Sequence, residues 1–317
     1  MAEMHALDLN LENALCSLCG PSHVEPVVSA KDYETPYSNT FCVVRCKECG
    51  LVFSSPRPSM VDLFKYFYGE DYVCYKSAGM ADRVRTSYLC KARFKQLKKI
   101  MPRGGRFLDV GCSYGYFLQY LQDKTDWEPY GCEPNRAMAQ IAISRGLDVR
   151  PEYLAGAGYR DDSFDMVYMS HVLEHVPDLV ETVQEVFRIL KPGGVFLTET
   201  PDFDSPMRER FGPCWWGYHL PRHLTHFTHD SITGLLSKVG LEVEKIKPCF
   251  RPGPMAWSVQ NLMKEKKMPV VLSSFFGMQN PFFVASLSPL AAWFLVNGHS
   301  EMMETLARKP THSRPLP

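Results

Sequence analysis

The residues best placed to do chemistry form a glycine-rich turn and an acid that follows it. The segment 109–115 reads Asp-Val-Gly-Cys-Ser-Tyr-Gly, and Glu133 comes after the next apolar run. Glycine in such a turn lets backbone N–H groups approach a ligand without a Cβ in the way. A carboxylate at the end of the next strand can accept hydrogen bonds from both hydroxyls of a ribose. The pattern predicts a nucleoside-containing cofactor, and by itself it is also compatible with NAD.

The form of the loop favours a cationic ligand. A dinucleotide site uses G-x-G-x-x-G, whereas this chain has Gly111 and Gly115 with Asp109 before them. An acid inside the loop would repel a pyrophosphate but would suit a positively charged group. The loop therefore indicates a cation-bearing cofactor.

Two cysteine pairs predict a metal site. Cys16 and Cys19 form one C-x-x-C knuckle, Cys46 and Cys49 form another, and a glycine follows each second cysteine. Four thiolates on two tight turns match tetrahedral zinc and leave no open position. We expect structural Zn²⁺ here, because a segment this short cannot bury a large core. Unliganded cysteines or a redox pair are the alternatives.

The elements that position these residues alternate along the chain. Apolar runs at 106–110, 129–133, 164–169, 195–200 and 241–246 read as strands, and helical patterns occupy 135–145, 180–190 and 231–239. The run 301–310 reads as a last, antiparallel strand. This alternation predicts an α/β fold with a doubly wound sheet.

At this point the sequence resembles the class I S-adenosylmethionine-dependent methyltransferases. Their glycine motif has the acid-x-Gly form, and further matching motifs are DSFDMV at 162–167, SHVLEHV at 170–176 and EVFRILKPGG at 185–194. The resemblance implies a Rossmann-like seven-stranded sheet with helices on both faces, to which the cysteine pairs add a small N-terminal zinc ribbon. It implies S-adenosyl-L-methionine as cofactor, and it assigns these cofactor-binding residues: Asp109, Gly111, Cys112, Gly115, Glu133, Leu154, Ser170 and His171.

A histidine-rich segment predicts where the acceptor reacts. Residues 215–229 hold four of the ten histidines and follow the fifth strand, at the carboxyl end of the sheet. The acceptor must lose a proton before or during methyl transfer, and histidine titrates in the useful range. The run RHLTHFT at 222–228 resembles a motif of sugar C-methyltransferases that carry an N-terminal four-cysteine domain. That resemblance indicates His223 as the general base and His226 as the second candidate; capping and packing are the structural alternatives.

Other features weigh on partners and location. Basic and acidic residues number 35 each, so a nonspecific polyanion binder is disfavoured. The first residues lack the pattern of a secretory signal and no apolar run is long enough to span a bilayer, which favours a cytoplasmic protein. The segment H-V-L-E-H at 171–175 also fits an inverted zinc-protease motif, but it directly follows a strand instead of lying in a long helix.

We expect three parts: a zinc ribbon at 10–56, a helical linker at 57–101 and a methyltransferase domain at 102–310. An apolar insert at 249–300 would serve as a lid, a port for an apolar substrate, a dimer contact or a peripheral membrane contact. The favoured function is methyl transfer to a small-molecule acceptor such as a sugar, secondary metabolite or lipid precursor. The alternatives are an RNA methyltransferase, which would grip RNA with the ribbon and the basic residues of 80–106, and a non-catalytic binding or scaffold protein with a vestigial site.

Overall fold

The computed structural model describes residues 5–68, 80–277 and 279–311. Residues 69–79 of the expected linker and residue 278 of the expected insert lie outside the described residues, as do the side chains of residues 80–86. Everything that follows concerns the described part of the chain.

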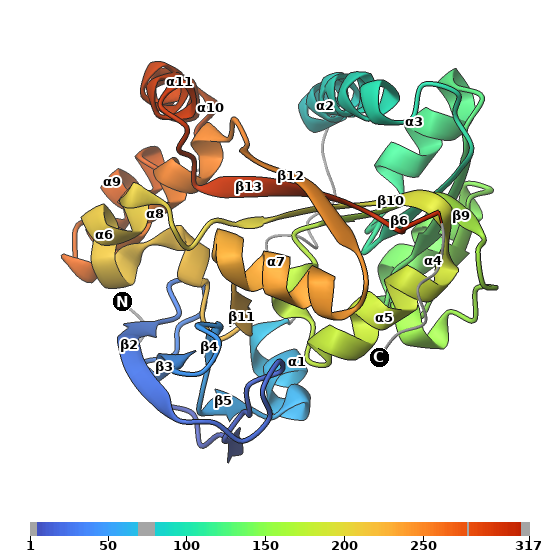
Figure 1. Ribbon diagram of the computed structural model, residues 1–317. Coiled ribbons are helices and arrows are strands. Elements are labelled where there is room, and N and C mark those ends of the chain that lie inside the picture. Colours follow the sequence, from blue (N-terminus) through green and yellow to red (C-terminus); the bar gives the residue numbers. More distant parts are fainter. Residues whose placement is uncertain (1–4, 69–79, 278, 312–317) are drawn as a thin grey trace.

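A seven-stranded mixed sheet forms the centre of the molecule (Figure 1). Its spatial order is β12-β13-β10-β9-β6-β7-β8, with β13 antiparallel to both of its neighbours. The strands are β6 (Arg106–Val110), β7 (Glu128–Cys132), β8 (Asp148–Arg150), β9 (Phe164–Ser170), β10 (Leu190–Pro201), β12 (Glu242–Pro248) and β13 (Met302–Arg308). The order reverses between β6 and β9, which is the place where an open α/β sheet binds its ligand. The α/β class and the antiparallel last strand are both confirmed.

Helices cover the two faces of this sheet because its strands alternate apolar side chains between them. Phe107 packs on one side with residues of α2, α3 and α4, and Leu108 packs on the other with residues of α5 and α7. The helices are α2 (Met80–Ile100), α3 (Tyr116–Lys124), α4 (Arg136–Ser144), α5 (Leu179–Ile189) and α7 (His229–Lys238). Two buried clusters, one on each face, therefore hold the sheet rigid beneath its carboxyl edge.

The segment after α5 differs from the sequence expectation. The residues Lys191-Pro-Gly-Gly194 are expected to end a helix and precede a strand, yet β10 already begins at Leu190. Leu190 pairs with Phe164, and the pairing resumes in a shifted register at Val195 with Met166. The proline and glycines thus form an irregularity inside a strand, because Leu190 is fully buried and stays in the sheet.

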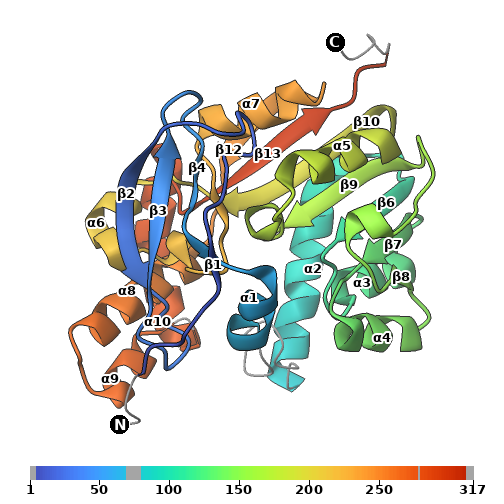
Figure 2. The same cartoon turned by 90° about the horizontal axis from the view of Figure 1, so that it is seen from below.

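A second sheet joins the N-terminal region to the histidine-rich segment. Its order is β11-β4-β3-β2, from β2 (Val24–Lys31), β3 (Thr40–Cys46), β4 (Val52–Ser54) and β11 (Thr225–His226). A short pair of strands, β1 (Leu11–Glu12) and β5 (Arg57–Pro58), and the helix α1 (Met60–Phe67) complete this region. Figure 2 shows β2 and β3 beside α6 (Pro206–Phe211) and α8 (Pro252–Glu265). The N-terminal region and the elements α6, β11 and α8 therefore lie together, and they form what is called the wall below.

Short helices lie between β12 and β13. After α8 come α9 (Val270–Phe275), α10 (Pro281–Ser286) and α11 (Ser288–Val296), at the edge of the molecule in Figure 1. Many of their large apolar side chains are exposed, with Phe282 at 85 % and Val296 at 87 %. Among the described helices, none combines the length and apolar composition that crossing a membrane requires.

Candidate functional site

The glycine loop follows β6 and leads into α3. Gly111 and Gly115 have φ values of +74° and +71°, in the left-handed region that favours glycine. A Cβ on Gly111 would lie 2.6 Å from Cγ2 of Val172, and one on Gly115 would lie 2.6 Å from Cδ1 of Leu147. Both glycines are thus required by conformation and by close packing, so the loop is preformed.

Two buried carboxylates stand beside this loop. Asp109 and Glu133 are each 8 % exposed and belong to the carboxyl ends of neighbouring strands. Glu133 accepts hydrogen bonds from the backbone N–H groups of Ser113 (2.9 Å) and Asn135 (2.8 Å). Burial raises the pKa of Asp109 to about 7, with Arg93 opposing the shift and Glu133 adding to it. The structure therefore brings together the acidic residues that the sequence singled out.

The other predicted cofactor residues occupy different environments. The Cys112 thiol is buried, and a Cβ on Gly131 would lie 2.7 Å from its sulfur, so only the backbone of Cys112 is available on the loop. Leu154 is buried in the short 3₁₀ helix η2 (Leu154–Gly156). The Ser170 hydroxyl donates to the carboxylate of Glu199 at 2.9 Å. The backbone of His171 has a φ of +57°, and its side-chain ring contacts the ring of Trp216.

Sequence reasoning missed an ion-pair cluster centred on Glu199. This residue of β10 is 1 % exposed, and its carboxylate accepts bonds from the guanidinium groups of Arg93 and Arg251. Burial alone would raise the pKa of Glu199, but the charges of Arg93 and Arg251 hold it well below its usual value. The available signal was an acid within the apolar run 195–200. The cluster ties α2 and the start of α8 to the carboxyl end of β9 and β10.

The histidine-rich segment is built onto the N-terminal sheet. In β11, Thr225 pairs with Phe53 and His226 pairs with Val52. The Ser54 hydroxyl donates to the carbonyl of His223 at 2.9 Å. This strand pairing could not be read from the sequence, because β11 has two residues and its partner lies far away in the chain.

His223 and His226 are both buried, at 2 % and 3 % exposure. Nδ1 of His223 lies 2.8 Å from the carbonyl oxygen of Gly217, so it donates there and Nε2 keeps a lone pair. Burial lowers the pKa of His223 well below its usual value, and His175 and His219 lower it further. Burial lowers the pKa of His226 to about 3, and its ring lies among Phe203, Tyr218 and His223. Both are neutral near pH 7, as a base must be.

Residues near the N-terminus complete the surroundings of these histidines. Asp32 forms a buried ion pair with Arg222, with Nη1 to Oδ1 at 3.1 Å. Oε1 of Glu34 lies 3.2 Å from Nε2 of His219. The hydroxyl of Tyr68 lies 2.9 Å from Nδ1 of His175. No motif marks these contributions in the sequence.

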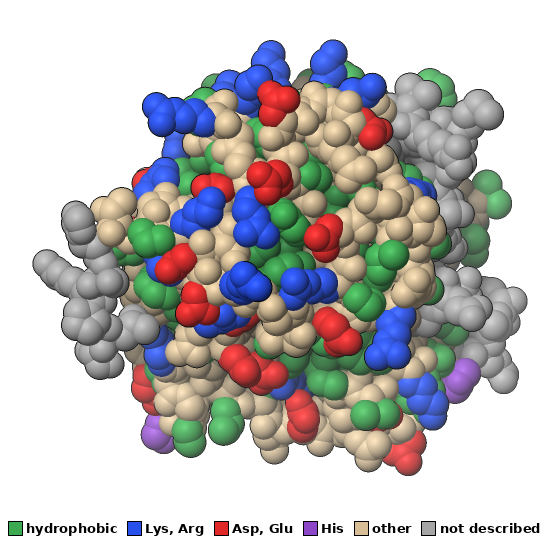
Figure 3. Space-filling view, turned by 90° about the vertical axis from the view of Figure 1, so that its right-hand side faces the viewer, with side chains coloured by type: hydrophobic (Ala, Val, Ile, Leu, Met, Phe, Trp, Pro, Cys, Tyr) green, Lys and Arg blue, Asp and Glu red, His purple; other side chains and the backbone are tan. Residues whose placement is uncertain are grey.

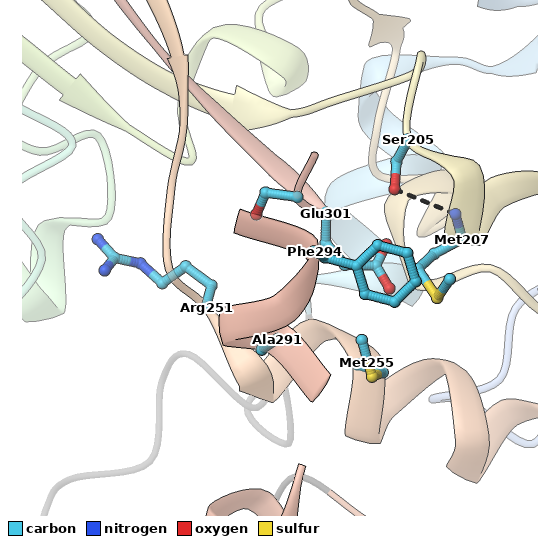
Figure 4. A pocket seen from close by; sticks show the side chains of 8 residues that line it. Ser205, Met207, Arg251, Met255, Ala291, Phe294 and Glu301 are labelled. Atoms are coloured by element: carbon cyan, nitrogen blue, oxygen red, sulfur yellow. Dashed lines mark hydrogen bonds between the residues drawn. The ribbon is translucent and has the colours of Figure 1, made fainter. Parts of the chain in front are cut away.

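Two pockets open near this wall. One is lined by acidic and aromatic residues from both parts of the chain, including Asp32, Glu34, Trp216, His219 and Trp257. The other is lined mostly by residues of the expected insert. There, Met255, Ala291 and Phe294, together with Met207 of α6, form an apolar lining around Glu301 (Figure 4). Burial raises the pKa of Glu301 to about 7, although the indole N–H of Trp215 donates to it.

The four cysteines of the two knuckles converge. Their sulfur atoms all lie within 4.8 Å of one another, and the Cys16 and Cys49 sulfurs are 3.5 Å apart. Gly20 N–H donates to Cys16 O and Gly50 N–H to Cys46 O, which gives both knuckles the same turn. Tetrahedral zinc with Zn–S bonds of about 2.3 Å needs sulfurs roughly 3.8 Å apart. The donor set and its spacing fit such an ion.

The segment 171–175 does not have the geometry of a zinc protease. Its last three residues form the 3₁₀ helix η3 (Leu173–His175), whereas the protease motif requires a long helix. Glu174 within it is fully buried.

A family model described as "Methyltransferase domain" matches residues 81–246, just over half of the chain. The chain belongs to this methyltransferase family. The matched residues contain the glycine loop, Glu133 and the whole histidine-rich segment.

The chain is also similar to individual proteins that are named as methyltransferases. It is 32 % identical over 155 residues to a probable S-adenosylmethionine-dependent methyltransferase of Mycolicibacterium smegmatis, covering 48 % of this chain and 58 % of that protein. It is 33 % identical over 124 residues to the sterol 24-C-methyltransferase erg6 of Aspergillus fumigatus, covering 35 % and 33 %. It is 30 % identical over 206 residues to the methyltransferase phqN of Penicillium fellutanum, covering 60 % and 62 %. The chain thus spans between a third and three fifths of these relatives.

Proposed function

We propose that the protein transfers the methyl group of S-adenosyl-L-methionine to a small-molecule acceptor. The observation that carries this proposal is that Asp109 and Glu133, at the ends of two neighbouring strands, both lie beside the glycine loop, with a histidine cluster at the same edge of the sheet. A carboxylate pair beside backbone N–H groups suits a ligand with a ribose and a cationic sulfur. The relatives that act on sterols support a small-molecule acceptor.

In this proposal the loop holds the donor. Asp109 faces the amino-acid part of the donor, while Gly111, Cys112 and Gly115 contribute their backbone. Glu133 accepts the ribose hydroxyls, after exchanging part of its present bonding to Ser113 and Asn135. Leu154 packs near the adenine, and Ser170 and His171 stand closest to the methyl group.

We propose that the acceptor enters beside residues 215–229 and is deprotonated there. His223 is the better candidate for the base, because its Nε2 lone pair faces other polar groups. His226 is the weaker candidate, because aromatic rings enclose it. Methyl transfer itself is an in-line displacement, so catalysis rests mainly on holding the two reactants in line.

The knuckle cysteines, Cys16, Cys19, Cys46 and Cys49, are proposed to bind structural zinc. Zinc bound there would fix the fold of the segment around β3 and β4, and β4 pairs with β11. Removing zinc with a chelator should therefore lower the melting temperature and loosen the histidine-rich segment. A melting curve insensitive to chelator, in protein without detectable zinc, would contradict this assignment.

We propose that the insert contacts a membrane surface. Residues 268–300 contain no Asp, Glu, Lys or Arg, and Lys266 and Lys267 precede them. Exposed apolar side chains next to basic residues suit an interface with anionic lipids. A second copy of this chain covering the same face would appear instead as a dimer in solution.

The proposed function is tested with methyl-labelled donor. The protein is incubated with the donor and with separated small-molecule, lipid and RNA fractions of a cell extract. Label in the small-molecule or lipid fraction supports the proposal, and label in RNA would support the alternative.

The surface charges bear on the RNA alternative. Lys91, Lys95, Lys98 and Lys99 form an exposed face of α2. Basic and acidic side chains are interspersed on the face in Figure 3, which does not favour an RNA surface. Failure to bind the donor in calorimetry would revive the scaffold hypothesis.

A further inference from the structure

A second cluster of metal-ligating side chains lies away from the cysteine knuckles. Glu174, His175 and His223 each place one ligand atom within 4.8 Å of the others. Glu174 and His175 belong to η3, and His223 precedes β11. The backbone N–H of Leu224 donates to the carbonyl of Glu174 at 2.8 Å, which holds the two segments together.

The hydrogen bonds of the two histidines leave each ring one nitrogen with a lone pair. His223 donates from Nδ1 to the Gly217 carbonyl, which leaves Nε2 without a proton, 3.9 Å from Oε1 of Glu174. Nδ1 of His175 lies 3.0 Å from the carbonyl oxygen of Arg222, which can only accept, and 2.9 Å from the hydroxyl of Tyr68, which can accept as well, so Nε2 of His175 keeps its lone pair. Metal-binding histidines characteristically donate their other N–H to a carbonyl in this way.

A third histidine stands beside the cluster. Nδ1 of His219 lies 3.4 Å from Nε2 of His223, and Nε2 of His219 lies 3.2 Å from Oε1 of Glu34.

Glu174 is the decisive residue. It is fully buried, and neither of its carboxylate oxygens has a hydrogen-bond partner among the described residues. Its ion-pair contacts are with histidines, His223 and His171, and the Nδ1 of His171 is 3.5 Å away. A buried carboxylate with neither a hydrogen-bond donor nor a counter-charge is strongly destabilising.

A comparison with Glu199 shows how this chain treats a buried acid without a metal. Glu199 is also nearly fully buried, but Arg93 and Arg251 neutralise it and Ser170 donates to it. Glu174 has no Arg or Lys within ion-pair distance among the described residues. A cation in the cluster would supply the charge partner that Glu174 lacks among the described residues.

We propose that Glu174, His175 and His223 bind a divalent transition-metal ion. Two imidazoles and one carboxylate suit Zn²⁺ or Fe²⁺ and leave a position open for another ligand. His171, with a side chain 40 % exposed, stands at the edge of the cluster. The ion is distinct from the one assigned to the four cysteines, which have no open position.

The inference rests on the proposed function for its chemical role. An acceptor oxygen on the open position would have a lowered pKa and would release its proton to solvent. That oxygen then forms a bond to the methyl carbon while the carbon–sulfur bond of the donor breaks and its electron pair stays on sulfur. In this state His223 is a ligand, and the ion takes over the role proposed above for His223 as a base.

The test measures metal content and Zn²⁺ binding by calorimetry. The wild-type protein, Glu174→Gln and His175→Gln are compared with a matched control, His299→Gln, which changes an exposed histidine outside the cluster. The wild type and the control should bind about two zinc ions per chain, and the two cluster variants about one. Donor affinity should change less than about twofold in all four.

Distinct outcomes separate this inference from the proposed function. Equal zinc content in all four proteins would overturn the second metal site. If the proteins then contain only one zinc ion each and still transfer methyl groups, the proposed function remains intact. Loss of donor binding by the wild type would instead overturn the proposed function, whatever the metal content. Melting curves identify a variant that has failed to fold, and the second cluster variant then carries the test.

Discussion

The part of the protein proposed to bind the donor and the part proposed to bind the acceptor, called here the donor side and the acceptor side, satisfy their buried polar groups differently. On the donor side, both oxygens of Glu133 are held by backbone N–H groups of the loop and of α4's start. On the acceptor side, both oxygens of Glu174, Nε2 of His226 and Nε1 of Trp216 are buried without a hydrogen-bond partner among the described residues. On the donor side, the fold itself therefore supplies hydrogen-bond donors to both oxygens of Glu133. The acceptor side has polar groups that only a ligand, an ion or water can satisfy.

The difference has a physical origin. A strand, a glycine turn and a helix fix the donor loop locally, and two apolar clusters support it from either face of the sheet. The acceptor wall is assembled from β4, η3 and β11, which are distant in sequence and short. Such a wall depends on long-range contacts, so its unfilled polar groups indicate function more strongly than they would in a surface loop.

The largest effect is expected when the imidazole of His223 is removed from the acceptor side. His223→Ala should lower turnover by about 10²–10⁴-fold, whether His223 acts as a base or as a metal ligand. Donor affinity should stay nearly unchanged, because His223 is outside the glycine loop. Steady-state kinetics and donor calorimetry on the same preparation check both halves of this prediction. Full activity in the variant would remove His223 from the chemistry.

A smaller but still large effect is expected on the donor side. Glu133→Ala should weaken donor binding about 100-fold, because two charge-assisted hydrogen bonds to the ribose are lost at about 1.5 kcal/mol each. Calorimetry measures the affinity. Glu133→Gln serves as the control, since its amide keeps one acceptor for the backbone donors. Unchanged affinity in folded Glu133→Ala would refute the ribose assignment.

How much could be predicted from sequence follows the same division. The strand 106–110 was placed with the bounds that β6 has, and the antiparallel last strand was also placed, because periodicity and glycine turns are local signals. The acid at 133 and the loop glycines were identified for the same reason. Arg93, Glu199 and Arg251 were missed, because the contact among them joins three elements and leaves no spacing pattern.

The acceptor wall shows the limit most clearly. The sequence of the segment 171–175 matches a metal motif, but it does not predict the long helix that a zinc protease needs. Its Glu174 and His175 do meet a third residue, His223, but only because β11 pairs with β4 and draws the two segments together. Sequence could supply the residue types but not this pairing.

The exposed insert extends the comparison to the surface. Phe282→Ser combined with Trp293→Ser should reduce binding to anionic lipid vesicles by roughly 30-fold, or about 2 kcal/mol in total, because side chains that enter the membrane surface only in part contribute less than the about 1.5–3 kcal/mol that each contributes when it leaves water completely. Both side chains are exposed, at 85 % and 59 %, so the fold should tolerate the changes. Vesicle co-sedimentation measures binding, and neutral vesicles test the contribution of Lys266 and Lys267. A sharp fall in dimer content, with vesicle binding unchanged, would assign the face to a second copy.

The smallest effect concerns pH and sharpens the electrostatic side of the comparison. Burial raises the pKa of Asp109 to about 7, so in donor-free protein this carboxyl is mostly protonated below pH 7. The cationic donor favours the ionised form, and binding must therefore release a proton below that pH. Donor affinity should rise about tenfold between pH 6 and pH 8 and then level off. The reason is that the ionised fraction of a carboxyl with a pKa of about 7 rises from about one tenth to about nine tenths over that range. Calorimetry in buffers of different ionisation enthalpy measures the released proton. Asp109→Asn should bind more weakly and lose the pH dependence, whereas a variant that kept the same slope would show that another group carries the proton.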